Sequence, residues 1–200
     1  GDPKKAWARG EAVKGPRLPL ERPPEIALKI PQTGAKTFEA ASLHELGAHP
    51  WAGQKVEMWL EVTDVAGQIG RSETREVTLP MRAFRKPLAR AVIEQRRKLA
   101  EDSRNRPYVV RALDALTIEP EGFIEKSSIY LGLRSVYHRI ERENSREAIV
   151  SSIDQLWNIA LKIDGNGPVP LAVSSTERIT KYAARTGARR ATTKSATKVC

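Results

Sequence analysis

The chain has little cysteine and no long hydrophobic run, and each absence excludes a class of protein. Cys200 is the only cysteine among 200 residues, which excludes an internal disulfide and a cysteine-based metal cluster. No stretch of about eighteen apolar residues occurs, so we expect a soluble chain without a membrane-spanning helix. No charged-then-apolar signal peptide opens the chain, which begins at Gly1 rather than Met. We expect either that an upstream segment has been removed or that the chain is a piece of a longer protein.

Sequence patterns of familiar catalytic sites are also missing. The chain has no Gly-x-Ser-x-Gly nucleophile elbow and no Gly-x-x-x-x-Gly-Lys phosphate loop. Ser127, Ser128 and Ser135 have no spacing to His138 that predicts a nucleophile and its base. We therefore predict a non-enzymatic protein with no catalytic residue, no cofactor-binding residue and no cofactor.

The remaining polar and aromatic candidates favour structural roles over a ligand site. His44 and His49 are five residues apart, whereas a helical metal pair requires a spacing of four, and no third ligand is in sight. Asp64 lacks the alternating Asp/Asn series of a calcium loop and is typical of a turn. We predict no metal site. We also expect core or module-interface packing, rather than a sugar or nucleobase platform, for Trp51, Trp59 and Trp157.

Positive charge is concentrated at the two ends of the chain. The formal net charge is +10. Residues 165–200 carry seven Lys/Arg against Glu177 alone, a net charge of +6, which leaves +4 for the other 164 residues. Much of that remainder lies in the first 29 residues, where seven Lys/Arg face four Asp/Glu. The high isoelectric point is therefore a property of the ends, and it does not indicate a basic folded surface.

Hydrophobic residues alternate in the first part of the chain. Apolar side chains recur at every second position from Lys55 to Thr63, as a half-buried strand requires. Glycines in the turn 64–70 and a return strand over 71–79 predict a hairpin. Further strands are expected over 26–30 and around 37–43. Four strands are fewer than the roughly seven of an immunoglobulin-like sandwich, so we expect strands upstream of Gly1 or a sheet that packs on helices.

A helical spacing takes over at Pro87. Helices are predicted from Pro87 to about Ala100 and from about Pro107 to Leu116. Asn144 and Glu147 have capping-box spacing for a fourth helix, which Gly165 ends. Because few residues join the third and fourth helices, these two must be antiparallel. The buried stripe of the third helix is predicted to be Ile129, Leu133, Val136 and Ile140, and that of the fourth Ile149, Ile153, Leu156, Ala160 and Ile163.

An ordered series of segments resembles a known family. The segments are His49-Pro50-Trp51-Ala52-Gly53, VTDVAGQIGRS (62–72), PLARAVIEQRRKLA (87–100), RALDALTIEP (111–120), YLGLRSVY (130–137) and LWNIALKI (156–163). Over about residues 20–165 the chain is similar to membrane-anchored envelope proteins of alphaproteobacteria that carry domain of unknown function 4175. The resemblance implies an interior slice of an exported region that follows a few membrane helices. It brings no established activity, so no catalytic residue is carried over.

The chain is expected to leave this family after Gly167. Members continue with charged, Ala/Leu-rich helix, whereas this chain turns to a Thr/Lys/Arg-rich end without an apolar stripe. A frameshift or a truncated reading frame would produce such a change. We interpret the tail as foreign to the fold and disordered.

The sequence therefore predicts an α+β fold in four parts. These are a flexible Pro-rich lead (1–24), a partial immunoglobulin-like antiparallel β module (25–80), a helical module of about four helices (84–164) and a disordered basic tail (165–200). The favoured function is a non-enzymatic scaffold or partner-binding region on the extracytoplasmic face of the envelope, with an unknown envelope protein or a second copy as partner. The alternative is weak, nonspecific binding of nucleic acid or an anionic surface through the tail.

Overall fold

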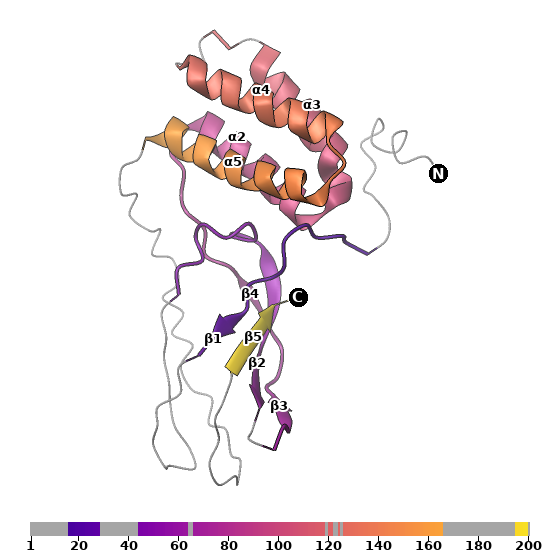
Figure 1. The fold of residues 1–200 in the computed structure, drawn as a ribbon. Helices are drawn as coiled ribbons and strands as arrows, with labels where there is room; N and C mark the ends of the chain where they lie inside the picture. Colours follow the sequence, from indigo (N-terminus) through magenta and orange to yellow (C-terminus); the bar gives the residue numbers. More distant parts are fainter. Residues whose placement is uncertain are drawn as a thin grey trace. The chain divides into compact units, whose positions relative to one another are not determined.

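The structure is a computed structural model of the 200-residue chain. It describes residues 16–28, 44–63, 66–118, 120–121, 124, 126–165 and, for the backbone alone, 195–199. These residues divide into two compact units (Figure 1). The helical unit holds residues 16–22 and 83–165, and the strand unit holds the other described residues.

The strand unit is an antiparallel sheet built around β2, Lys55–Thr63. Along one edge β2 pairs with β3, Ile69–Arg71, and then with β4, Arg75–Thr78. Along the other edge it pairs with β5, Ser195–Val199, which also pairs with β1, Ile26–Ala27. The predicted hairpin is confirmed, because β2 pairs antiparallel with β3 and β4, the strands that follow it in the chain.

The return strand is interrupted between β3 and β4, which the alternation of the sequence does not predict. Ser72 occupies the gap. Its backbone N–H donates to the Leu60 carbonyl at 3.0 Å, and its hydroxyl accepts from the Leu60 N–H at 2.9 Å. The hydroxyl thus satisfies a backbone donor of β2 that the interruption would otherwise leave unpaired.

Among the described residues, the strand unit has a small core. Val56 and Leu79 are buried, and Leu46, Trp51 and Val77 pack against them. The described strands belong to one sheet, so the α+β class is confirmed, whereas the likeness to a two-sheet immunoglobulin domain stays a prediction. The expected strand around 37–43 lies outside the described residues.

In the described residues, four α-helices lie close to where the hydrophobic spacing predicts them. They are α2, Pro87–Glu101, α3, Arg106–Ile118, α4, Ser127–Arg142, and α5, Arg146–Asp164. A 3₁₀ turn, η1 (Ser103–Asn105), joins α2 to α3. Pro87 takes the first position of α2, where its missing N–H costs no hydrogen bond. The predicted helical module is therefore confirmed, with bounds that shift by a few residues.

The four helices pack in a closed ring around one core. α2 packs against α3 and α5, and α4 packs against the same two helices (Figure 1). Every residue of the two predicted stripes, on α4 and on α5, is buried in this core. The period-3.6 pattern thus identifies the inward faces of both helices.

The predicted cap of α5 is off by one residue. The N-cap is Ser145, whose hydroxyl accepts from the Ala148 N–H at 3.3 Å. Asn144 instead accepts a hydrogen bond from Arg106 of α3 at 2.9 Å. Adjacent Asn and Ser are equally good caps by type, and the contact with Arg106 decides between them.

The two segments predicted to be flexible or disordered, 1–24 and 165–200, each contain residues with a defined structure. Residues 1–15 of the expected flexible lead lie outside the described part, but Leu20 is 6% exposed and belongs to the helical core. Its prolines prevent a helix, as expected, without preventing packing. Most of the expected disordered tail, 166–194, also lies outside the described residues, and the five residues after it form β5.

Candidate functional site

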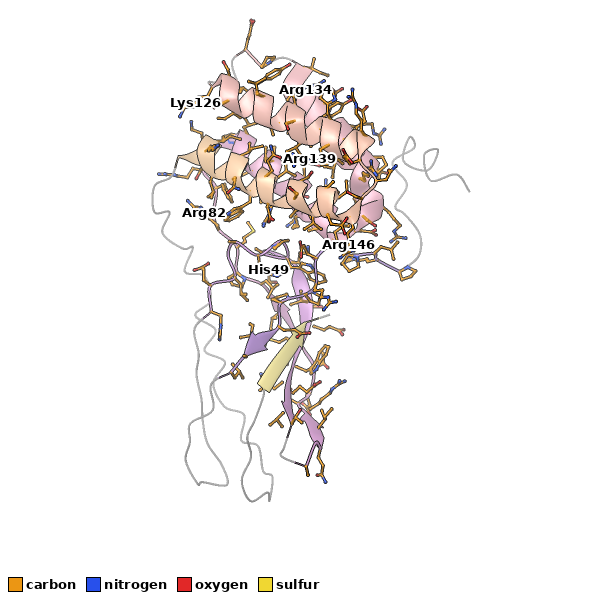
Figure 2. All side chains as sticks on the ribbon, viewed as in Figure 1. His49, Arg82, Lys126, Arg134, Arg139 and Arg146 are labelled. Carbon is orange, nitrogen blue, oxygen red and sulfur yellow. The ribbon has the colours of Figure 1, made fainter. Side chains whose placement is uncertain are left out.

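Of the two histidines considered as metal ligands, His49 lies in a tight turn that precedes β2, and His44 lies just before that turn. The Trp51 N–H donates to Nδ1 of His49 at 3.1 Å, so that nitrogen serves as an acceptor within the turn. His49 is labelled in Figure 2. Backbone hydrogen bonds from His49 to Leu46 and from Ala52 to His49 close the turn. No group of three or more His, Cys, Asp or Glu residues that could hold a metal ion occurs among the described residues. Asp64 lies outside them.

The three tryptophans that could have formed a ligand-binding platform contact other groups of the protein. Trp51 packs on the small core of the strand unit. The Trp59 ring lies 5.7 Å from the guanidinium carbon of Arg71. Trp157 packs against the helical core and meets Phe84 edge to face, with ring centroids 5.6 Å apart. These contacts agree with the packing roles predicted for Trp51 and Trp157.

The serines considered as nucleophiles and His138 all lie on α4. Ser127 and Ser128 begin α4, while Ser135 and His138 lie further along the same helix. The Nδ1 atom of His138 lies 3.6 Å from the Glu141 carboxylate.

Length and hydropathy together determine whether a helix can span a membrane. None of the described helices combines the length and the apolar character that a span requires.

A buried arginine joins α2 to α5. Arg96 is 4% exposed, and its Nε donates to the Ile153 carbonyl at 3.1 Å. Its guanidinium carbon lies 4.8 Å from the centroid of the Trp157 ring. Burial lowers the pKa of Arg96 to about 10, although the charges of Asp154 and Glu21 oppose the shift. Arg96 is therefore charged at neutral pH, where it can stack on the ring as a cation.

A second arginine closes the C-terminal end of α4. Arg106 donates to the carbonyls of Ile140 and Glu141 and to the side chain of Asn144. These carbonyls have no partner within their own helix. A positive charge at this end also complements the helix dipole. Arg106 thus fixes the start of α3 against the end of α4.

The surface side chains of α4 reach both neighbouring helices. Arg134 donates to Asp114 of α3 at 2.7 Å, and Arg139 donates to Gln155 of α5 at 2.9 Å (Figure 2). Together with Arg106, Arg134 shows that α3 and α4 are antiparallel. This register brings Ile118 and Leu131 to the same end of the pair. Both are unusually exposed for large apolar residues, at 68% and 64%.

Several polar groups meet Asp102 at the end of α2. Asp102 caps η1 by accepting from the Arg104 N–H at 3.0 Å, and it pairs with the Arg104 guanidinium. Its carboxylate also accepts from the backbone N–H of Leu18. Burial alone would raise the pKa of Asp102, but these hydrogen bonds and the charge of Arg104 bring it below its ordinary value of 3.8. Asp102 therefore holds residues before the strand unit against the helices.

We expect the Asp102→Asn variant to be less stable than the parent at pH 7, by an amount that shrinks below about pH 3.8. The folded-state pKa of Asp102 is depressed, so its contribution is present above the unfolded-state pKa and is lost as pH falls through the folded-state value. Urea unfolding at pH 7, 5 and 3 measures the difference. Glu143→Gln, at the exposed end of α4, is the control. A stability difference between the parent and Asp102→Asn that is as large at pH 3 as at pH 7 would contradict the assignment.

Sequence reasoning missed these anchors because most of them join distant parts of the chain. Arg96 and Ile153 are 57 residues apart, and Arg106 and Ile140 are 34 apart. No local pattern marks such a pair. Asp102 is the exception, because an aspartate directly before a helical turn is a recognised capping signal.

A known protein family matches most of the chain. The family described as Domain of unknown function (DUF4175) matches residues 4–184. The chain belongs to this family. The family match continues beyond Gly167 to residue 184. The expected departure of the DUF4175 chain from its family is therefore not supported over residues 168–184. No curated protein and no solved structure matches the chain.

Some residues in the segments that resemble the DUF4175 family lie at positions where packing or backbone conformation restricts the side chain. Gly132 lies where α4 meets α5, and a Cβ there would be 3.2 Å from Cδ1 of Ile159. Gly53 has φ +79°, and a Cβ there would be 2.6 Å from the Met81 sulfur. A side chain at position 132 would require Ile159 to shift by a few tenths of an ångström, and the positive φ at position 53 is one that other residues rarely adopt. Trp157 completes the stack with Arg96. These three residues therefore have structural roles in the DUF4175 chain.

Proposed function

We propose that this chain is a non-enzymatic, extracytoplasmic region of a membrane-anchored envelope protein, and that it acts as a scaffold or partner-binding module. The family membership is compatible with such a role but assigns none. The envelope location rests on the resemblance of the sequence to membrane-anchored proteins. The two parts of the proposal need separate tests.

The use of buried polar side chains supports a scaffold. Arg96 binds the Ile153 carbonyl, Asp102 binds the N–H groups of Leu18 and Arg104, and Asp164 binds those of Arg85 and Lys86. A catalytic group must instead face a substrate atom. In the described part of the chain, these charged side chains hold helices and chain segments together, which favours a structural or docking role.

Protease accessibility tests the location. The full-length protein is expected in the membrane fraction of the bacterium that makes it. In spheroplasts, added protease should cut this region without cell lysis. A cytoplasmic protein of known location, probed in the same sample, reports lysis. Cleavage that requires lysis would place this region inside the cell and contradict the proposal.

Site-specific crosslinking tests the partner-binding role. A photo-crosslinking amino acid at Leu131, and separately at Ile118, is expected to trap a protein partner or a second copy in intact cells, because both positions are exposed and apolar. Ser151, exposed on α5, is the control position. Equal crosslinking at all three positions, or none at Leu131 and Ile118, would count against a docking surface at this end.

The basic tail makes a separate prediction. Any affinity of the full chain for DNA should fall by up to about a thousandfold between 50 and 200 mM salt, as expected when several Lys/Arg contact phosphates. A chain whose seven tail Lys/Arg are replaced by Gln should lose that affinity. Fluorescence anisotropy with two unrelated duplexes measures both effects. Sequence-selective binding that survives the replacements would favour the nucleic-acid alternative over the scaffold.

A further inference from the structure

A short segment before the strand unit is bound to the helical unit as a peptide ligand would be. We define the strap as Arg17–Leu20. The Leu18 N–H donates to Asp102, and the Leu18 carbonyl accepts from the Ser103 N–H at 2.9 Å. The Leu20 N–H donates to the Ala100 carbonyl at 3.0 Å, and the Leu20 carbonyl accepts from Arg146. Both backbone groups of two alternate residues are therefore satisfied, with Pro19, which has no N–H, between them.

Side chains of the strap add selectivity to these backbone contacts. Leu20 is 6% exposed and enters the hydrophobic core of the helical unit. Arg17 pairs with Glu101 at 2.7 Å. Leu18 is 53% exposed and contributes its backbone. Backbone hydrogen bonds for affinity, with pockets for selected side chains, are the usual physics of extended-peptide recognition.

The groups that hold the strap belong to elements with their own support. Ala100, Ser103 and Arg146 lie on α2, η1 and α5, and α2 and α5 pack on each other through a core that reaches far beyond Leu20. The elements that form the site are therefore held together mainly by contacts other than those with the strap. Pro16 and Pro19 keep the strap extended, so little conformational entropy is lost when it docks.

We propose that the corner formed by the end of α2, η1 and the start of α5 is a peptide-binding site, and that the strap is its intramolecular occupant. Its ligand class is an extended peptide with a basic residue three positions before a leucine and a proline directly before that leucine. A partner segment of this chemistry binds by displacing the strap, which acts as a built-in competitor. This inference does not depend on where the protein resides.

The test uses the full chain with Leu20→Asp, which disfavours docking of its own strap, and a fluorescent peptide of residues 14–22. Anisotropy is expected to show at least about tenfold tighter peptide binding to this variant than to the parent, whose site is filled. Matched peptides test the side-chain pattern. Leu20→Asp in the peptide should abolish binding, whereas Leu18→Asp should leave it within about threefold, because Leu18 faces solvent.

Two results would overturn the proposal. One is a folded Leu20→Asp chain, with cooperative unfolding, that does not bind the parent peptide. The other is equal binding of the two Asp-containing peptides. If the variant does not fold, the parent chain is cleaved after folding at a protease site inserted after Arg22. Retention of fragment 1–22 on gel filtration, and its displacement by excess peptide, are then expected. Immediate loss of the fragment without rebinding would reject the site.

Discussion

Leu133→Ala is expected to lower the free energy of unfolding of the helical unit by about 2–5 kcal/mol, the range for deleting a buried leucine side chain. Leu133 lies on the inward stripe of α4 and is 0% exposed, as is Leu156 on α5. Truncation of either leaves a cavity between two packed helices, which can collapse only in part. Leu156→Ala should therefore have an effect of similar size. Urea or thermal unfolding followed by circular dichroism measures both.

Leu131→Ala is the matched control for this prediction. It removes the same atoms from the same helix only two residues away, but Leu131 is 64% exposed. Its unfolding free energy should stay within about 0.5 kcal/mol of the parent value. Similar losses at positions 131 and 133 would mean that the assigned inward face of α4 is wrong.

Asp164→Ala is expected to lower the unfolding free energy by about 2–3 kcal/mol. One carboxylate oxygen of Asp164 accepts from the N–H groups of Arg85 and Lys86 at 2.8 and 2.9 Å. The N-cap residue of α2, Lys86, makes no side-chain capping hydrogen bond of its own. Asp164 is 5% exposed, and its loss removes the acceptor of both N–H groups.

Two comparisons separate this capping role from other effects of the substitution. Asp164→Asn keeps an acceptor oxygen without the charge and should lose roughly half as much stability. Asp154→Ala removes an exposed carboxylate from the same helix and should cost less than about 1 kcal/mol. If Asp164→Asn proves as unstable as Asp164→Ala, charge rather than hydrogen bonding dominates.

The helical half of the fold can be predicted from sequence because its signal is local. Ile129, Leu133, Val136 and Ile140 recur at helical spacing, and burial of that face is the main reason the helix forms. The hairpin is likewise visible as alternation on both sides of a glycine-containing turn. In each case one short window of sequence contains the residues that determine the element.

The features of the fold that the sequence does not predict depend on contacts between residues far apart in the chain. Ser145 rather than Asn144 caps α5, because Arg106 from another helix binds Asn144. Leu20 is a single apolar residue among prolines, and one buried side chain creates no periodicity. The candidate site was missed for the same reason, since Asp102 and Arg146 meet the strap from parts of the chain more than 80 residues away from it. Local patterns correctly indicated elements and could not indicate which of their residues bind one another.

The hydrogen bonds of Asp164 also have an architectural consequence. They join residues 85–86, where the chain begins the helical bundle, to the last residue of α5, where the chain leaves it. The two ends of the segment 85–164 are thus held within hydrogen-bonding distance of each other. Segments with adjacent ends are the ones that tolerate insertion into a host chain or circular permutation. Apart from the strap, whose Leu20 enters its core, the bundle is therefore closed at its two ends. We expect that its old ends can be linked and new ends opened between α3 and α4 with the helices still packing in the same order.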